Sequence, residues 1–107
     1  MVRFEWDELK NRVNIRKHGL SFEDASTVFY DPDAILFDDP SHSIIENRFL
    51  IIGITRKASV CIVSHCYRGK DEIIRIISAR KATKREREVY NGQGELQKWE
   101  KNTILQN

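Results

Sequence analysis

The side chains most able to take part in catalysis gather in one stretch near the C-terminal end of the chain. This stretch combines imidazole, phenol, hydroxyl, guanidinium and ammonium groups, from His65, Tyr67, Arg68, Arg75, Ser78, Arg80, Lys81, Lys84, Arg85 and Tyr90. An imidazole can transfer protons near neutral pH, and a guanidinium donates paired hydrogen bonds to phosphate oxygens. The combination suits metal-independent RNA cleavage, in which a 2′-hydroxyl loses a proton, a 5′ oxygen gains one, and cations stabilise the charged transition state.

Within this stretch, His65 is the first candidate for proton transfer, and Arg75 and Arg80 are the candidates for phosphate binding. Tyr67 or Tyr90 could stack on a splayed base or share a proton. The cations expected to hold the RNA backbone are Arg68, Lys81, Lys84 and Arg85. Each group also has an ordinary structural role, because a histidine in an apolar strand is more often hydrogen-bonded in the core and surface arginines are usually solvated.

The strand expected over residues 72–80 would distribute its two arginines by alternation. One face carries Ile74, Ile76, Ser78 and Arg80, and the other carries Ile73, Arg75, Ile77 and Ala79. Each face therefore combines an arginine with isoleucines. This pattern indicates a sheet surface flanked by guanidinium groups.

Other catalytic chemistries find little support in the sequence. The three histidines and two cysteines have no metal-ligand spacing, and the chain has no glycine-rich phosphate loop or Gly-x-Ser-x-Gly motif. We therefore expect no metal or other cofactor. His18 at a helix end is most simply a partner of the helix dipole, and His42 lies in an acidic loop where solvation is expected.

The net charge of +2 hides an uneven distribution along the chain. Residues 23–46 contain no Lys or Arg and seven acids, which are Glu23, Asp24, Asp31, Asp33, Asp38, Asp39 and Glu46. Residues 75–88 contain six basic and two acidic side chains. This layout suits a protein that meets a polyanion on one side and a basic partner on the other, although such blocks are often solvated surface.

The 107 residues predict one domain, and a hydrophobic content of 40% with 32% charged residues predicts a globular one. The longest apolar run, Phe49–Ile54, is too short to span a membrane, and the N-terminal residues lack the apolar core of a signal peptide. Cys61 and Cys66 are five residues apart, which places them on opposite faces of one strand. These features predict a cytoplasmic protein without membrane association.

Two helices are expected near the N-terminus to help position these groups. Asp7 can cap the first, which runs to about His18 and ends at Gly19. Its narrow apolar stripe consists of Leu9, Val13 and Ile15. Ser21 opens the second helix, which the Asp-Pro-Asp sequence at 31–33 ends.

A small antiparallel sheet and a further helix are expected to follow. The predicted strands are residues 34–37, 48–55, 59–67 and 72–80. A third helix begins at Ala82 or Thr83 and ends near Tyr90, and residues 95–105 form an amphipathic piece. The pattern indicates an α+β fold with its helices on one face of the sheet.

The motifs at both ends of this pattern resemble the BrnT toxin family. The N-terminal motif comprises Phe4-Glu5-Trp6-Asp7, Lys10, Asn14, Lys17-His18-Gly19, Ser21-Phe22, Ala25, Val28-Phe29 and Asp31. The C-terminal motif comprises Gly53, residues 65–69, residues 75–82, Glu86 and Tyr90. The resemblance covers residues 3–90, so we expect a toxin domain over residues 1–90 and an extension of that domain or a tail over residues 91–107.

The resemblance implies a RelE-like fold and a ribonuclease toxin of a type II toxin–antitoxin pair that cleaves RNA and inhibits growth. It implies a BrnA-like ribbon-helix-helix antitoxin as partner, with operator DNA bound only through the complex. Within this frame, Lys17, His18 and Tyr90 join His65, Arg75 and Arg80 as candidate catalytic residues. The alternative is a non-catalytic module that binds nucleic acid or protein, in which His65 is structural.

Overall fold

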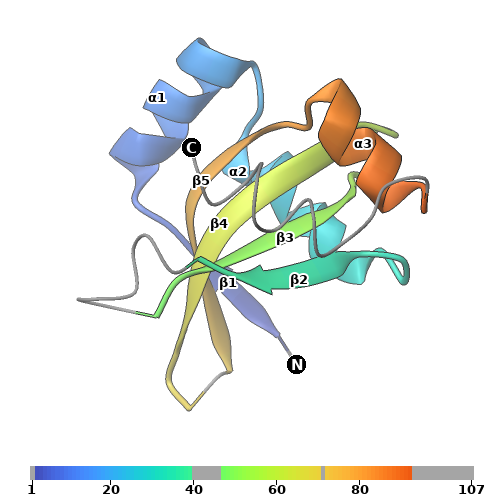
Figure 1. Cartoon of the computed structure of the whole chain (residues 1–107). Helices are drawn as coiled ribbons and strands as arrows, with labels where there is room; N and C mark the ends of the chain where they lie inside the picture. Colours follow the sequence, from blue (N-terminus) through green and yellow to red (C-terminus); the bar gives the residue numbers. More distant parts are fainter. Residues whose placement is uncertain (1, 40–46, 71, 93–107) are drawn as a thin grey trace.

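A computed structural model describes residues 2–39, 47–70 and 72–92, which form one sheet and its covering helices (Figure 1). In chain order the elements are β1 (Arg3–Glu5), α1 (Glu8–His18), α2 (Phe22–Ser26), the 3-10 helix η1 (Thr27–Tyr30), β2 (Ile35–Asp38), β3 (Phe49–Ile54), β4 (Val60–Arg68), β5 (Ile73–Lys81) and α3 (Lys84–Tyr90). The five strands lie in the order β1-β5-β4-β3-β2. The predicted α+β class is confirmed.

The sheet is mixed rather than wholly antiparallel. Strands β2 to β5 pair antiparallel with their neighbours, and for β3, β4 and β5 the short connections predicted this. β1 instead pairs parallel with β5, with Arg3 opposite Ile73 and Glu5 opposite Arg75. Sequence analysis missed β1 because three residues are too few to display an alternating pattern.

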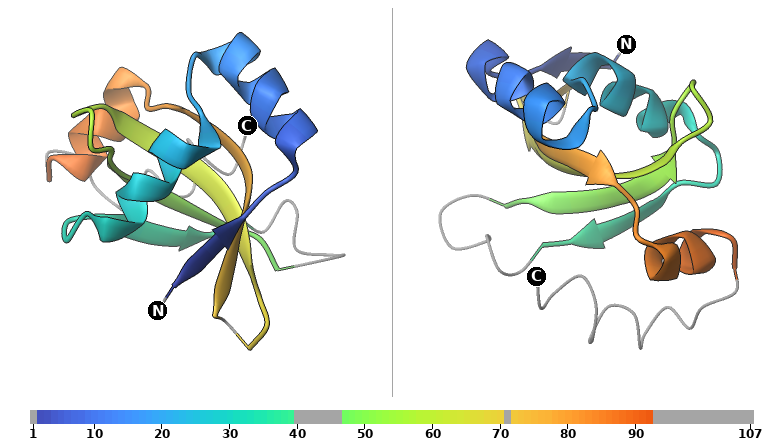
Figure 2. Two further views of the ribbon diagram at one scale, coloured as in Figure 1. Left: turned by 180° about the vertical axis from the view of Figure 1, so that it is seen from behind. Right: turned by 90° about the horizontal axis from the view of Figure 1, so that it is seen from above.

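The helices cover both faces of the sheet, so the expectation of a single covered face was wrong. Figure 2 shows α1 and α2 on one side and α3 on the other. Ile51 and Val63 belong to the apolar cluster that includes α2, whereas Ile52 and Ile62 pack with Val89 of α3. Consecutive apolar residues on central strands are what a sheet buried on both faces requires.

Local sequence signals explain where the N-terminal helices begin and end. The Asp7 carboxylate accepts hydrogen bonds from the Leu9 and Lys10 amides at 2.8 and 3.4 Å, which caps α1. Gly19 ends the helix with φ of 66°, a left-handed conformation that glycine adopts without strain. Ser21 caps α2 through the Asp24 amide, as predicted.

Helix α1 packs on the body of the protein through asparagines rather than through its apolar stripe. Its buried residues are Asn11 and Asn14. The predicted stripe lies outward instead, with Leu9, Val13 and Ile15 exposed at 68%, 47% and 44%. An apolar stripe on a helix usually faces the core, so this helix departs from the ordinary pattern.

Asn14 joins α1 to the edge of β5. Its side-chain oxygen accepts a hydrogen bond from the Ala79 amide at 3.1 Å, and its side-chain nitrogen donates to the Leu20 carbonyl at 2.9 Å. The register of β1 on β5 ends at Arg75, so Ala79 lies on a part of β5 that β1 does not cover. Asn14 thereby satisfies a backbone donor on that edge.

A β-bulge changes which faces the β5 side chains occupy. Ser64 pairs with Ser78 and His65 pairs with Ile76, so Ile77 is an extra residue in β5. Arg75 and Arg80 therefore lie on the same face, the one covered by α3, because their partners on β4 are four residues apart. Alternation had predicted opposite faces, and it failed because the bulge depends on strand pairing rather than on local composition.

Some expectations fall outside the described residues. These are the placement of His42, the amphipathic piece at 95–105 and the division of the chain after residue 90. Within residues 2–39, 47–70 and 72–92, no helix is long and apolar enough to cross a membrane.

We predict that Asn14→Ala destabilises the protein by about 2–3 kcal/mol, because the Ala79 amide and the Leu20 carbonyl would each lose a buried partner. Urea unfolding followed by circular dichroism measures this loss. Arg12→Ala on the exposed side of the same helix is the control. Equal stability of the two variants would contradict the anchoring role of Asn14.

Candidate active site

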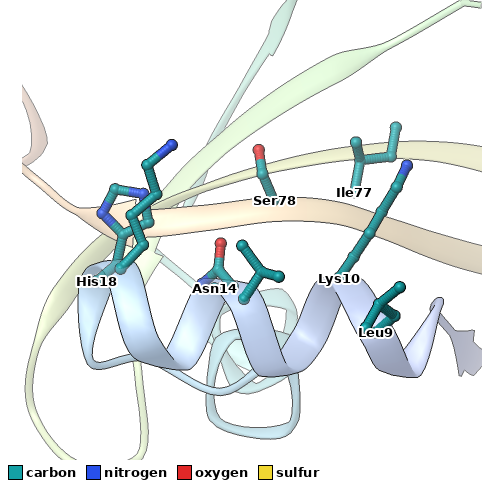
Figure 3. Close-up of a pocket in the computed structure, with 8 residues that line it drawn as sticks. Leu9, Lys10, Asn14, His18, Ile77 and Ser78 are labelled. Atoms are coloured by element: carbon teal, nitrogen blue, oxygen red, sulfur yellow. The ribbon is translucent and has the colours of Figure 1, made fainter.

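A groove of about 310 Å³ lies between α1 and β5 (Figure 3). The residues that line it are Leu9, Lys10, Val13, Asn14, Lys17, His18, Ile77 and Ser78. In Figure 3, His18 lies toward the C-terminal end of α1, whereas Leu9 and Lys10 lie toward its other end, level with Ile77. We call Lys17, His18 and Ser78 the polar end of the groove, and Leu9, Lys10, Val13 and Ile77 the aliphatic end.

The polar end brings together two residues that sequence analysis had placed among the catalytic candidates. Lys17 and His18 occupy the last turn of α1, where cations also interact favourably with the helix dipole. Both side chains are exposed, and Ser78 of β5 is exposed opposite them. Ser78 shares its sheet face with Arg80, because their partners Ser64 and Ile62 are two residues apart on β4.

Arg80 is fixed by a buried carboxylate. Its guanidinium donates two hydrogen bonds to Glu86, at 2.8 and 3.0 Å, and the Glu86 side chain is fully buried. Glu86 also accepts from the Thr83 amide at 2.8 Å and completes a capping box that starts α3. Burial opposes the ionised carboxyl, but hydrogen bonds from Arg80 and Thr83 keep the pKa of Glu86 below its usual value.

Arg75 and Arg68 lie near the opposite end of β5, where both face Glu5 of β1. Arg75 donates to the Glu5 carboxylate at 2.7 Å, and Arg68 lies 3.8 Å from the same oxygen. Four residues of β5 lie between Arg75 and Arg80. The structure therefore brings the predicted arginines to one face, but it does not gather them at one point.

Tyr90 anchors the end of α3 to the loop after η1. Its hydroxyl donates to Asp31 at 2.5 Å, and Asp31 also accepts from the amides of Ile54 and Asp33. Burial, followed by the neighbouring Asp31 carboxylate, raises the pKa of Tyr90 to about 12. The Tyr90 phenol is therefore a weaker acid than an ordinary tyrosine, and its contacts are those of a structural residue.

His65 lies in the core, and its environment argues against the proton-transfer role predicted for it. The side chain is fully buried, with ring contacts to Phe29, Phe49 and Tyr67. Its ring nitrogens make hydrogen bonds to the Val63 carbonyl at 3.2 Å and the Tyr67 hydroxyl at 3.1 Å. Burial lowers the pKa of His65 to about 4, so the ring is neutral at physiological pH and inaccessible to a substrate.

The basic segment at the end of β5 and the start of α3 is exposed to solvent. Lys81, Lys84 and Arg85 are all exposed, and residues 80–88 carry five basic and two acidic side chains. The capping box holds the first turn of α3, which carries Lys84 and Arg85. These three predicted RNA-binding cations lie at the Arg80 end of β5, whereas Arg68 lies at the other end.

Sequence analysis placed Lys10, Asn14 and Glu86 in the family motifs but assigned none of them a role in the site. Lys10 is seven residues from Lys17, a spacing of about two helical turns that places both on one side of α1. That spacing could have indicated a shared surface. The roles of Asn14 and Glu86 depend on partners distant in the sequence or on burial. In the described part of the chain, no group of three or more His, Cys, Asp or Glu side chains is arranged to hold a metal ion.

We predict that His65 makes stability fall as the pH decreases. Its folded pKa of about 4 lies below the ordinary 6.5, so between these values the unfolded chain binds the additional proton and stability falls by about 1.4 kcal/mol per pH unit. The free energy of unfolding of the parent and of His65→Gln should be measured between pH 6.5 and 4.5. The same slope in both proteins would exclude this effect.

We predict that Arg80→Ala destabilises the protein by about 3 kcal/mol, since it leaves the buried Glu86 carboxylate unpaired. Arg80→Ala/Glu86→Ala should be more stable than the sum of the single changes predicts, because the double variant carries no unpaired buried charge. Urea unfolding of the four proteins gives the coupling energy. Additive effects would show that the two side chains do not stabilise α3 as a pair.

The comparisons with known proteins agree with the resemblance read from the sequence. The family model described as "Ribonuclease toxin, BrnT, of type II toxin-antitoxin system" matches residues 6–86. The crystal structure of the Brucella abortus ribonuclease toxin BrnT is similar, with a TM-score of 0.60 and 29% sequence identity over 78% of this chain and 100% of that one. No curated protein matches significantly. The chain belongs to the BrnT family of ribonuclease toxins of type II toxin–antitoxin systems.

Proposed function

We propose that this toxin cleaves RNA without a metal ion at the polar end of the groove. The observation that carries the proposal is the position of His18, which is exposed beside Lys17 and Ser78 at the edge of β5. Of the two histidines in the described part of the chain, His18 is the one that solvent and substrate can reach. Metal-independent RNA cleavage requires such an accessible proton-transfer group.

In the proposed reaction, His18 takes the proton from a 2′-hydroxyl as its oxygen attacks the adjacent phosphorus. The bond from phosphorus to the 5′ oxygen breaks, and the Lys17 ammonium delivers a proton to that oxygen. The products are a 2′,3′-cyclic phosphate and a 5′-hydroxyl. Arg80, which Glu86 holds on the Ser78 face of β5, donates to the phosphate oxygens as charge accumulates.

The exposed cations after β5 are proposed to hold the RNA backbone. Lys81, Lys84 and Arg85 lie beyond Arg80, so an RNA strand crossing the edge of β5 would meet them after the cleavage point. Arg75 and Arg68 are proposed to extend this contact at the other end of the strand, where Glu5 orients them. Tyr90 supports the site by fixing α3.

We also propose the kind of antitoxin, the cellular location and the limits of the toxin domain. Type II membership implies an antitoxin partner and an RNA substrate, and we propose a BrnA-like ribbon-helix-helix protein as the neutralising antitoxin, with DNA bound only through the complex. RNA as the substrate supports a cytoplasmic location. A RelE-like arrangement and a toxin domain over residues 1–90 are proposed because helices flank one small sheet and α3 ends at Tyr90.

We predict that His18→Ala lowers the rate of RNA cleavage at least about a hundredfold, the usual contribution of a general base. EDTA should leave the parent rate unchanged, and the fragments should carry 2′,3′-cyclic phosphate ends. Labelled RNA on a denaturing gel measures the rate, and phosphatase treatment identifies the ends. Urea unfolding checks that the variant is folded.

The matched control is Lys70→Gly, which removes an exposed cation from the β4–β5 turn. Lys70 has φ of 59°, where glycine is unstrained, so the fold should persist and cleavage should continue. Activity that EDTA abolishes, or parent-like cleavage by His18→Ala, would contradict the proposed mechanism. Intact RNA with salt-sensitive retention by the parent would support the non-catalytic binding module instead.

A further inference from the structure

We propose that the aliphatic end of the groove binds an acidic, apolar segment of the antitoxin, which then covers His18. This inference rests on the proposed function, because it assumes that a protein antitoxin neutralises the toxin. The proposal concerns Leu9, Lys10, Val13 and Ile77, which line the part of the groove away from His18 and Lys17.

Helix α1 exposes an unusual amount of aliphatic surface. Leu9 and Val13 are one helical turn apart and line the groove, yet they are exposed at 68% and 47%. The helix is attached to the body through Asn11 and Asn14, so its aliphatic side chains make a small contribution to the core. Exposed aliphatic side chains that line a groove are typical of a surface that binds another protein.

Helix α1 and the groove carry positive charge. The residues from Leu9 to His18 include four Lys or Arg side chains and no acid. Of the described residues that line the groove, Lys10, Lys17 and His18 can carry positive charge and none is acidic. A partner segment with carboxylates beside its apolar residues would complement this surface in both respects.

The side chains at the aliphatic end favour a protein segment over RNA as the occupant. Single-stranded RNA is held by aromatic rings that stack on bases and by cations that contact phosphates. Among the described lining residues, the apolar ones are Leu9, Val13 and Ile77, which offer no ring for stacking. Burying phosphates against aliphatic side chains would cost desolvation energy, whereas burying apolar side chains of a protein gains free energy.

The position of this surface gives neutralisation a direct mechanism. The same helix carries Leu9 and Val13 in its first half and Lys17 and His18 in its last turn. A helical segment of about ten residues spans roughly 15 Å, the length of α1, so a segment seated on Leu9 and Val13 would extend over His18. The antitoxin would then exclude RNA from the polar end without contacting Arg80.

The test uses paired substitutions on α1 in the full-length toxin. The probe is the protein encoded by the reading frame adjacent to the toxin gene, purified and titrated against each toxin by isothermal calorimetry. We expect Leu9→Ala/Val13→Ala to weaken binding about 30-fold and Lys10→Glu to weaken it about tenfold. Free toxin carrying Leu9→Ala/Val13→Ala should cleave RNA at the parent rate, and the antitoxin should neutralise both variants less effectively than the parent.

The controls change the same kinds of side chain where they do not line the groove. Ile15→Ala removes a side chain that is 44% exposed, and Arg12→Glu reverses an exposed charge. We expect each to change binding by less than about threefold. Equal weakening by the groove and control variants, or no weakening by the groove variants, would overturn the proposed surface.

Two further outcomes would assign the surface to another occupant and so overturn the proposal. One is loss of RNA cleavage by Leu9→Ala/Val13→Ala with antitoxin binding intact, which would make the aliphatic end part of the RNA site. The other is self-association of the free parent toxin that this variant abolishes. Failure of the proposed function is distinguishable, because the parent itself would then leave RNA intact or escape neutralisation.

Discussion

The uncovered edge of β5 is the constraint on which the rest of this structure depends. β1 pairs with β5 only as far as Arg75, and the backbone beyond that point needs partners of another kind. Asn14 supplies one by accepting from the Ala79 amide. This hydrogen bond ties α1 to the strand, and a groove lined by Val13 and Ile77 lies between the helix and β5.

Near the C-terminal end of β5, one ion pair stabilises the fold and also positions a candidate site residue. Arg80 compensates the buried Glu86 carboxylate, and Glu86 in turn caps α3. A paired guanidinium is less free to move than a solvated one, so in the proposed mechanism Arg80 is positioned before the phosphate binds. The ion pair also reduces the net positive charge at Arg80, so in the proposed function the long-range attraction of RNA falls to the exposed Lys81, Lys84 and Arg85.

Much of the local structure could be predicted from the sequence, because local signals determine it. Asp7, Gly19 and Ser21 correctly marked the limits of the N-terminal helices, and the short turns indicated the antiparallel strands. Features that depend on strand pairing could not be predicted from these local signals. The bulge at Ile77 placed Arg75 and Arg80 on one face, and the parallel β1 was too short to detect.

The candidate site was only partly predictable for the same reason. The basic residues 81–85 were identified from residue type, whereas the Lys17-His18 pair became a candidate through the family resemblance; Lys81, Lys84, Arg85, Lys17 and His18 are all exposed. Nothing in the local sequence distinguished a catalytic His65 from a buried one, since its burial depends on rings from η1 and β3. Family membership confirmed the class of activity, whereas the roles of individual residues remain proposals.

Because α3 is short, its exposed cations Lys84 and Arg85 depend on local contacts for their positions. A seven-residue helix is unstable in isolation, so the capping box and the Tyr90 contact with Asp31 must stabilise α3. Fraying of these roughly two helical turns would displace Lys84 and Arg85 while the five strands stayed paired. In the proposed RNA contact, the affinity for RNA therefore depends on this local unfolding equilibrium of α3, separately from the global unfolding of the protein.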